Sequence, residues 1–507
     1  MFNSVKHSLK YNPSKFGYQL LAQFSVGTTT KSDPTPQECT RKSASHTMYG
    51  QPTPLTHPHL VKHGEVIPGV SLQELKRRRS KLVESIVQEN CAKNRQQVIV
   101  IPASSKVYMS DRIPYVFRQN TDFLYFSGCQ EPDSILVLIC KEDKFSSVLF
   151  VRPKDQHSEL WDGPRTGVDM ATEMFGTDYA LPVTQFDQFL TSFLQKDEKS
   201  IVWYDHADVV QPVLHKKLCQ LIKLTDNQIF ASPKTLFHQA RLIKSACEID
   251  LMRKSCEIAS KAIQKTIQFS RPGMSEHQLF ATVDYECRMR GAEHLAYPPV
   301  VAAGKNANTI HYISNNQIIQ SGDLVLMDAG CEYHGYSSDI TRTWPINGKF
   351  TPEQKALYEL VLDVQKDLIK NLKNLPSLDN TFQRMCALLG KKLQDIGLIP
   401  SNFSEDKVLA AAYMYCPHHV SHYLGMDVHD NGKIPRNIQI QPGMIITIEP
   451  GVYVSPNNPY APIHFHGLGI RIEDDILVTE NGAEVLTKNC PKEVAEIEAL
   501  ASQNQGC

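Results

Sequence analysis

The chain has 507 residues, more than one typical hydrophobic core holds, so we expect two domains and an additional segment. Its 53 basic and 54 acidic side chains give a net charge of −1, which provides no electrostatic footprint for nucleic acid or an anionic membrane. The longest apolar run, near residues 135–140, is far shorter than the roughly 20 residues that span a bilayer. The 13 cysteines show no disulfide-framework spacing, which favours a reducing intracellular compartment.

The first 32 residues contain no Asp or Glu but several lysines, serines and threonines. An acid-poor, basic and hydroxyl-rich composition is typical of a mitochondrial transit peptide, so we expect residues 1–50 to be a cleaved presequence with a linker, and the mature protein to reside in the matrix. No arginine precedes Arg41, so a tail without a targeting role and a cytosolic form are the alternatives. A Pro-rich segment, YGQPTPLTHPHL, then predicts extended backbone.

Residues 51–235 carry the pattern of an α/β domain. Ser71 and Glu74 form a capping box that begins a helix, and the KRRR run inside this helix indicates a solvated face rather than a nucleic-acid contact. Apolar runs at 98–101, 134–140, 147–151 and 201–204 predict buried strands that alternate with helical stretches.

Residues 236–507 predict a second domain of α+β class. Apolar residues from Ile249 to Ile267 recur at steps of three and four, and Pro272-Gly273 ends this helix. Further helices begin at Ser275 and Thr351. Strands are expected at 323–330, 337–344, 443–454 and 468–479, so the helices are segregated from antiparallel strand pairs.

Each of these four strands carries a carboxylate where its pattern predicts burial: Asp328, Asp339, Glu449 and Glu473. A single buried carboxylate is most often a structural hydrogen-bond acceptor, but four of them beside the histidine-rich stretch CPHHVSHYLGMDVHD (416–430), expected to be strand and loop, favour a metal site. Two Asp, two Glu and one His suit two divalent cations, Mn²⁺ or Co²⁺ in type, with Zn²⁺ as an alternative.

The motifs MDAG, SSDITRTW, HHVSHYLGMDVHD, TIEPGVY and GIRIEDD together resemble the M24 metallopeptidase family, in its aminopeptidase P branch. The upstream stretch YVFRQNTDFLYFSGCQEPDSILVL resembles the N-terminal domain of that branch, and PTPLTHPHL and ELWDGPRTG resemble its mitochondrial form. The resemblance starts near residue 50. It implies an α+β chain in which a smaller, creatinase-like α/β domain precedes a catalytic domain of the pita-bread fold.

Carried over to this sequence, the resemblance implies five metal ligands, of which the second and fifth bridge both ions: Asp328, Asp339, His422, Glu449 and Glu473. It also implies catalytic roles for His429, Glu449 and Arg471, and substrate contacts for Tyr297, His311, His418, His429 and Arg471. Because Arg471 and Glu473 are two residues apart on an expected strand, we expect their side chains to share a face. The alternative for the histidines and Tyr297 is a structural role in packing or backbone hydrogen bonding, and Cys416 and His419 are expected to be structural.

The implied activity is a metal-dependent aminopeptidase. It removes the first residue of peptides or proteins that have proline second, using a hydroxide activated by two metal ions. A prolidase, which accepts only Xaa-Pro dipeptides, and a non-catalytic pita-bread protein that binds partners are the alternatives; such non-catalytic relatives generally lack ligands that are all present here. The resemblance also implies a homodimer, with ELWDGPRTG as a candidate contact.

Overall fold

The structure is a computed structural model that describes residues 48–89, 95–141, 144–196, 200–224 and 229–503. The expected transit peptide and most of its linker lie outside these residues. The chain forms two compact units, Met1–Ala240 and Arg241–Cys507, and the boundary falls inside helix α8 (Lys234–Leu242).

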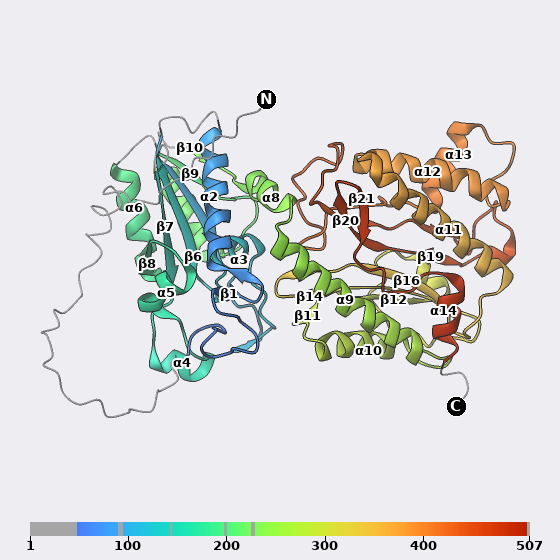
Figure 1. The fold of residues 1–507 in the computed structure, drawn as a ribbon, viewed down its shortest axis with the longest axis horizontal. Helices are drawn as coiled ribbons and strands as arrows, with labels where there is room; N and C mark the ends of the chain where they lie inside the picture. Colours follow the sequence, from blue (N-terminus) through green and yellow to red (C-terminus); the bar gives the residue numbers. More distant parts are fainter. Residues whose placement is uncertain (1–47, 90–94, 142–143, 197–199, 225–228, 504–507) are drawn as a thin grey trace, which may run out of the picture. The chain divides into compact units, whose positions relative to one another are not determined.

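Unit 1 is built on a mixed sheet of six strands in the order β10-β9-β3-β6-β7-β8. The strands are β3 (Gln97–Pro102), β6 (Ile135–Lys141), β7 (Lys144–Val151), β8 (Tyr179–Pro182), β9 (Ile201–Trp203) and β10 (Ile229–Ala231). The antiparallel pairs β3–β6 and β6–β7 lie at the centre, with parallel neighbours outside them. The centre strands are almost wholly buried because helices cover both faces (Figure 1), which explains why they read as continuous apolar runs.

The helices of unit 1 are α2 (Leu72–Gln88), α3 (Thr121–Ser127), α4 (Gln156–Asp162), α5 (Gly167–Phe175), α6 (Phe186–Lys196) and α7 (Pro212–Leu224). Phenylalanines of α6 and leucines of α7 pack on the valines of β3, β6 and β7 to form one core. Two short hairpins, β1 (Glu65–Ile67) with β2 (Val70–Ser71) and β4 (Tyr108–Ser110) with β5 (Ile113–Pro114), complete the unit.

Unit 2 contains four small antiparallel sheets, β12-β13-β16, β11-β14-β15, β17-β20-β21 and β18-β19. Their strands are β11 (His294–Leu295), β12 (Val300–Ala303), β13 (Leu324–Ala329), β14 (Cys331–Tyr333), β15 (Tyr336–Ser337), β16 (Ile340–Pro345), β17 (Ile445–Ile448), β18 (Gly451–Tyr453), β19 (Gly469–Arg471), β20 (Asp474–Thr479) and β21 (Gly482–Val485).

Helices enclose these strands: α9 packs on β14, β15 and β16, α10 packs on β11 and β12, and α11 packs on β17, β18 and β19. The helices are α9 (Ala246–Phe269), α10 (Glu276–Met289), α11 (Pro352–Asn371), α12 (Leu378–Asp395), α13 (Glu405–Tyr415) and α14 (Val494–Ala501). Figure 1 shows the helices around the outside of unit 2, with the strands between them. The predicted capping box at Ser275 is present, and the helix expected to begin at Thr351 does so with a capping box of its own. At Ser71 the serine side chain accepts the N–H of Glu74, while the Glu74 carboxyl pairs with Arg77 and Arg78. The apolar stripes of α9 and α11 are buried in a single core.

Three of the four long strands expected in unit 2 are interrupted, which corrects the prediction. Strand 337–344 breaks between β15 and β16, strand 443–454 between β17 and β18, and strand 468–479 between β19 and β20. Asp339, Glu449 and Glu473 lie in these breaks. A residue outside the ladder is released from the strict alternation of faces, and Pro450 has no N–H with which to continue the ladder after Glu449.

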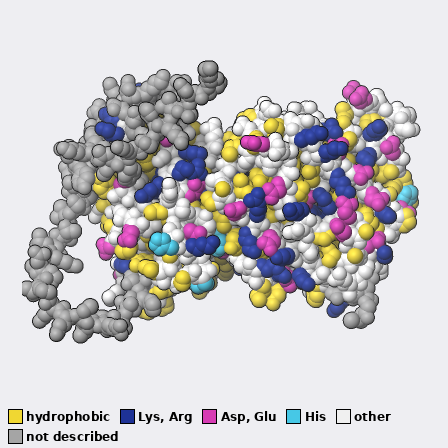
Figure 2. All heavy atoms as spheres, in the orientation of Figure 1, with side chains coloured by type: hydrophobic (Ala, Val, Ile, Leu, Met, Phe, Trp, Pro, Cys, Tyr) yellow, Lys and Arg dark blue, Asp and Glu magenta, His cyan; other side chains and the backbone are white. Residues whose placement is uncertain are grey.

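The surface is of mixed charge on the face that Figure 2 shows, where lysines and arginines are interspersed with aspartates and glutamates. Among the described residues, ten cysteines are free thiols and no helix is long and apolar enough to cross a bilayer.

Candidate metal centre and active site

The four carboxylates predicted from the strand patterns converge on one cavity in unit 2, of about 540 Å³. Asp328 projects from β13, and the other three come from the strand breaks that follow β15, β17 and β19. The cavity is lined by Ile310, His311, Asp328, Asp339, Leu378, His418, His419, Ser421, His422, Tyr423, His429, Asp430, Asn431, Gly432, Ile434, Pro435, Arg436, Glu449, Arg471 and Glu473. It therefore contains every predicted site residue except Tyr297.

Gly330 fixes the approach of two of the strands to each other. A Cβ at this position would lie 1.7 Å from the carbonyl oxygen of Ser338, which directly precedes Asp339. Because such an overlap requires the backbone to move, the glycine of the MDAG motif keeps Asp339 beside Asp328.

Asp339, His422 and Glu473 form the tightest group, with one ligand atom from each lying within 4.8 Å of the others. The Nδ1 of His422 lies 3.1 Å from the carbonyl oxygen of Tyr423, an acceptor, so Nδ1 carries the proton and Nε2 is the free ligand atom. That Nε2 lies 3.3 Å from Asp339 and 3.8 Å from Glu449. Four of the five predicted ligands, Asp339, His422, Glu449 and Glu473, thus lie together around the Nε2 edge of His422.

Asp328 is joined to the group through Tyr297. The Tyr297 hydroxyl lies 2.5 Å from Oδ1 of Asp328 and 2.5 Å from Oδ1 of Asp339, while Oδ2 of Asp328 accepts a hydrogen bond from Arg471 at 2.7 Å. Burial and the two carboxylate charges raise the pKa of Tyr297, so its hydroxyl stays protonated. Tyr297, predicted to contact substrate, therefore bridges two acids instead of lining the cavity.

The charge of this group is only partly balanced by the chain. Burial raises the pKa of Glu473 well above its usual range, and the nearby Asp339 and Glu449 add to this shift. Burial also raises the pKa of Glu449, to about 7. Although burial favours a neutral imidazole, Asp339 and Glu449 raise the pKa of His422 to about 9.

The residues fit divalent cations. Carboxylate oxygens with one imidazole nitrogen are the donors that Mn²⁺, Co²⁺ and catalytic Zn²⁺ accept, and mutually repelling buried acids are stabilised by added positive charge. No cysteine lines the cavity, unlike the sites that hold structural zinc.

The two acids that follow Glu473 have different partners. Asp474 is completely buried and accepts hydrogen bonds from Arg342 at 2.7 Å and Gln365 at 2.8 Å, with Lys492 also paired to it. Asp475 accepts the backbone N–H of Asp339 at 3.0 Å. Of three consecutive acids, therefore, only Glu473 faces the cavity; Asp474 pairs with buried side chains and Asp475 holds the backbone at Asp339.

Arg471 ends β19, so the expectation that it shares a strand with Glu473 is wrong, although both side chains line the cavity. All three of its nitrogens have partners: Nε donates to Thr341, Nη1 to Tyr453 and Nη2 to Asp328. Arg471 therefore holds the wall of the cavity as well as facing it.

The histidine-rich stretch is largely loop: no strand forms within it, and Tyr423 contributes a single isolated bridge to Ile446. The rings of His422 and His429 meet edge to face, with centroids 4.5 Å apart. His418 lies 2.9 Å from the Tyr453 hydroxyl, and burial beside Arg471 lowers its pKa to about 4. His419, expected to be structural, stacks on Phe382 and also lines the cavity.

Sequence reasoning missed Thr341 and Tyr453, which organise the site. The Thr341 hydroxyl donates to Glu473 at 2.6 Å, and Tyr453 joins Arg471 to His418. Both lie inside motifs that were singled out, DITRTW and EPGVY, but a hydroxyl between two charged groups leaves no periodic signal.

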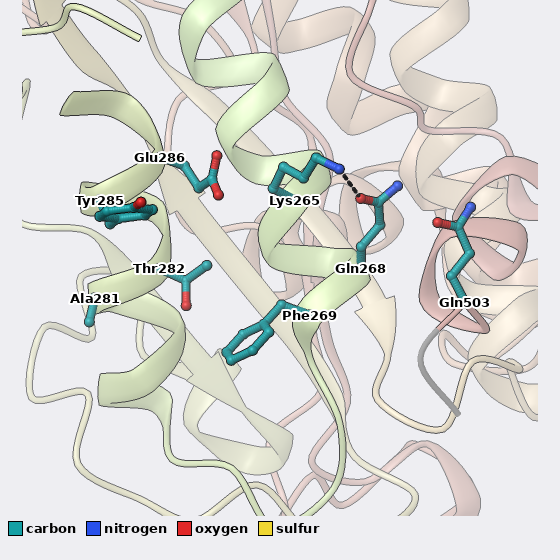
Figure 3. A pocket seen from close by; sticks show the side chains of 8 residues that line it. All are labelled: Lys265, Gln268, Phe269, Ala281, Thr282, Tyr285, Glu286 and Gln503. Carbon is teal, nitrogen blue, oxygen red and sulfur yellow. Dashed lines mark hydrogen bonds between the residues drawn. The ribbon is translucent and has the colours of Figure 1, made fainter. Parts of the chain in front are cut away.

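A second hollow of similar volume, about 560 Å³, lies between α9 and α10 on unit 2. Figure 3 shows Phe269, Tyr285 and Thr282 along it, with Lys265 donating a hydrogen bond to Gln268. The residues that line it include no cluster of metal-ligating groups, unlike those of the first cavity.

The fold and the site define a divalent-metal hydrolase with pita-bread architecture. The chain belongs to metallopeptidase family M24, whose model matches residues 250–480, and residues 75–203 match the aminopeptidase P N-terminal domain. It is therefore a metal-dependent peptidase.

Its relatives are similar over nearly the whole length. Xaa-Pro aminopeptidase 3 from Homo sapiens is 45% identical over 90% of this chain and 90% of the relative. Intermediate cleaving peptidase 55 from Arabidopsis thaliana, described as mitochondrial, is 40% identical over 90% and 88%. The structure of zinc-substituted E. coli aminopeptidase P in complex with product aligns with a TM-score of 0.76 and 36% identity, over 85% of this chain and 98% of that one.

Proposed function

We propose that this chain is an Xaa-Pro aminopeptidase, which removes the N-terminal residue from peptides or proteins with proline in second position. The observation that carries the proposal is the convergence of five metal-ligating side chains, together with His418 and His429, on one cavity. The similarity to human Xaa-Pro aminopeptidase 3 supports the substrate class.

Asp328, Asp339, His422, Glu449 and Glu473 would hold two divalent cations. Bound cations of this kind lower the pKa of a water molecule and polarise the scissile carbonyl. We favour Mn²⁺, because four of the five donors are carboxylates; Co²⁺ and Zn²⁺ are the alternatives. Thr341 and Tyr297 would keep the carboxylates oriented through their hydrogen bonds.

Glu449 would move a proton during hydrolysis. Its carboxyl lies 3.8 Å from the Nε2 of His422 and 3.7 Å from the Nδ1 of His418. It would take a proton from the attacking water and return it to the departing nitrogen. The nitrogen of a proline residue has no N–H in the peptide and must gain this proton to leave.

His429 would donate to the oxygen that becomes negative as water adds to the carbonyl. It lies beside the ligand group, with its ring 4.5 Å from that of His422, and on a lining loop. A donor fixed at this point stabilises the transition state more than the ground state. His418 and His311 would flank the proline ring, with Arg471 on the cavity wall and Tyr297 behind it, bonded to Asp328 and Asp339.

We infer a mitochondrial matrix location with a removed presequence, supported by the acid-poor N-terminal composition and by the mitochondrial relative from Arabidopsis. The assignment of residues 1–50 to a presequence and linker, 51–235 to the N-terminal domain and 236–507 to the catalytic domain belongs to the same proposal.

We also infer a homodimer. Leu160 and Trp161 of the ELWDGPRTG segment are 79% and 76% exposed, and the hairpin of β4 and β5 is exposed as well. Lys106, beside the hairpin, is ion-paired to Asp162 at 2.8 Å, so the two apolar regions adjoin. Exposed apolar patches of this kind favour association with a partner. Light scattering tests the homodimer, because the variant Trp161→Glu should be monomeric.

Protein N-termini without proline in second position are a second candidate substrate class, because relatives from Arabidopsis and yeast are named intermediate cleaving peptidases.

The test supplies the Mn²⁺-loaded chain with a tripeptide that has proline second, the matching dipeptide, and a longer peptide without proline. Release of residue one from the tripeptide supports the proposal, whereas cleavage of the dipeptide alone indicates a prolidase. No cleavage of any of the three, with metal bound, overturns it.

A further inference from the structure

Glu276 is a completely buried carboxylate that takes no part in the metal site. It is the first residue of α10, and its two oxygens accept four hydrogen bonds, each of 2.9 Å. Oε1 accepts from the backbone N–H of Ala303 and from Nδ2 of Asn306, while Oε2 accepts from the hydroxyl of Tyr312 and the backbone N–H of Gln317. All four donors are uncharged.

These donors lie at intervals along one segment, 303–317, which is otherwise irregular. The segment leaves β12, forms a short 3-10 turn (Gly304–Asn308) and carries Ile310 and His311 into the wall of the cavity. Asn306 also donates to the Tyr312 hydroxyl at 3.1 Å, which closes a ring of hydrogen bonds around the carboxylate. A loop without a ladder is thus held at its start, middle and end by one side chain.

The other side of the segment presses on the strand that ends at Arg471. A Cβ on Gly469 would lie 2.6 Å from the carbonyl oxygen of Ala307, so the backbones approach closely, and Asn308 donates to the carbonyl of Gly467 at 3.0 Å. Ile310 and Tyr312 pack against a small apolar cluster that includes Tyr453, the partner of both His418 and Arg471. A shift of the segment would therefore displace the cavity wall at Arg471 and His418.

We propose that Glu276 is a positioning residue: by anchoring segment 303–317, it sets the place of His311 and Ile310 and so the affinity of the cavity for the proline side of a substrate. This rests on the proposed function. A carboxylate is needed here because each oxygen meets two donors. A glutamine would turn an N–H₂ group toward two of them, and a backbone N–H cannot reverse its role.

The experiment compares the full chain, loaded with Mn²⁺, with Glu276→Gln. With an Xaa-Pro tripeptide we expect KM to rise about 10–100-fold, because a misplaced wall weakens binding, while kcat changes less than about threefold. The double variant Glu276→Gln, His311→Ala should raise KM by less than the product of the two single-variant increases, because both residues act on one contact with the substrate. Bound metal should be unchanged.

Hydrogen exchange supplies a readout that is independent of activity. Amides in 303–317 should exchange faster in Glu276→Gln, while those of β16 keep their wild-type rates. Glu286→Gln is the matched control, since Glu286 lies on the same helix but faces the hollow of Figure 3. If Glu276→Gln folds poorly, Tyr312→Phe, which removes one donor and keeps the ring, should produce a smaller rise in KM in the same direction.

Unchanged KM and unchanged exchange in Glu276→Gln would overturn the inference. So would a double variant with His311→Ala whose KM rises by the full product of the two single increases. Failure of the proposed function looks different, because the wild-type chain itself would then cleave no peptide. In that case, binding of the dipeptide Pro-Leu, measured by calorimetry, replaces KM, and equal binding and equal exchange in both chains reject the positioning role.

Discussion

Buried charged side chains have different partners in the two units. In unit 1, Arg79 of the KRRR run is 1% exposed, which corrects the prediction that this run forms a solvated face. It donates to the carbonyls of Phe126 at 2.9 Å and Gly176 at 2.7 Å, so the backbone completes its hydrogen bonding. In unit 2, Asp339 and Glu473 are 5% and 1% exposed, yet their neighbours include other acids. The difference shows which charges serve folding and which leave a requirement for an added cation.

The same contrast recurs within unit 2, between Glu473 and Asp474. Asp474 is paired with Arg342 and Lys492, and these charges outweigh its burial and hold the pKa of Asp474 well below its usual range. The pKa of Glu473 is shifted upward. Of these two adjacent residues, Asp474 serves the fold and Glu473 serves the site. Four substitutions test this distinction between structural and functional charges.

Glu473→Gln should have the largest effect. On the proposed function Glu473 helps to bind the two cations, so its loss removes several kcal/mol of charge stabilisation and kcat/KM should fall by more than about 10³-fold. The metal-free chain should be no less stable at pH 8, because a carboxyl whose folded pKa is raised costs stability when the unfolded chain ionises. Tripeptide hydrolysis and urea unfolding check the two parts. A large loss of stability would place Glu473 among the structural acids.

Arg342→Met should destabilise unit 2 by about 3–5 kcal/mol, because it leaves Asp474 buried without its fully buried cationic partner. Urea unfolding of the metal-free chain measures this change. A loss below about 1 kcal/mol would mean that Lys492 and Gln365 suffice for Asp474.

Arg79→Met should cost about 1–3 kcal/mol in unit 1, since it leaves backbone carbonyls without donors. Because the charge serves folding alone, kcat and KM for an Xaa-Pro tripeptide should stay within about twofold of wild type. A tenfold change in kcat at unchanged metal content would contradict that separation.

The smallest effect concerns Glu74, in α2. Although burial opposes ionisation, Arg77 and Arg78 lower its pKa from 4.5 to about 2. Because the folded pKa is depressed, the ionised carboxylate contributes stability above pH 4.5, and this is lost as pH falls toward 2. The pair is partly solvated, so Glu74→Gln should cost about 1 kcal/mol or less at pH 7 and nothing near pH 2. A difference that grows on acidification would contradict the assignment.

Much of the fold could be predicted, because its signals are local. The apolar runs of β3, β6 and β7, the stripe of α9, the capping box at Ser275 and the helix start at Thr351 all depend on near neighbours in the chain. The strand breaks at Asp339 and Glu473 were not predicted, because apolar residues continue on both sides of them in the sequence and the ladder is ended by tertiary contacts such as the bond from Asp339 N–H to Asp475. The break at Glu449 does have a local signal, since Pro450 has no N–H for the ladder.

The candidate ligands were identified because four acids in apolar strands are unusual and because their motifs resemble a known family. The supporting groups were not. Tyr453, Thr341 and Glu276 act through hydrogen bonds to residues 18 to 132 positions away in the chain, and nothing in their own neighbourhoods distinguishes them from packing residues. Proximity in space is the information that the sequence lacked.

Calorimetry with Mn²⁺ measures how many cations the cavity binds. We expect two equivalents per chain in the wild type, a loss of binding in Glu473→Gln, and unchanged binding in Glu484→Gln, a surface acid paired with Arg253. Binding of two equivalents that survives Glu473→Gln, or no binding to the wild type, would contradict the assignment of the cavity as a two-metal centre.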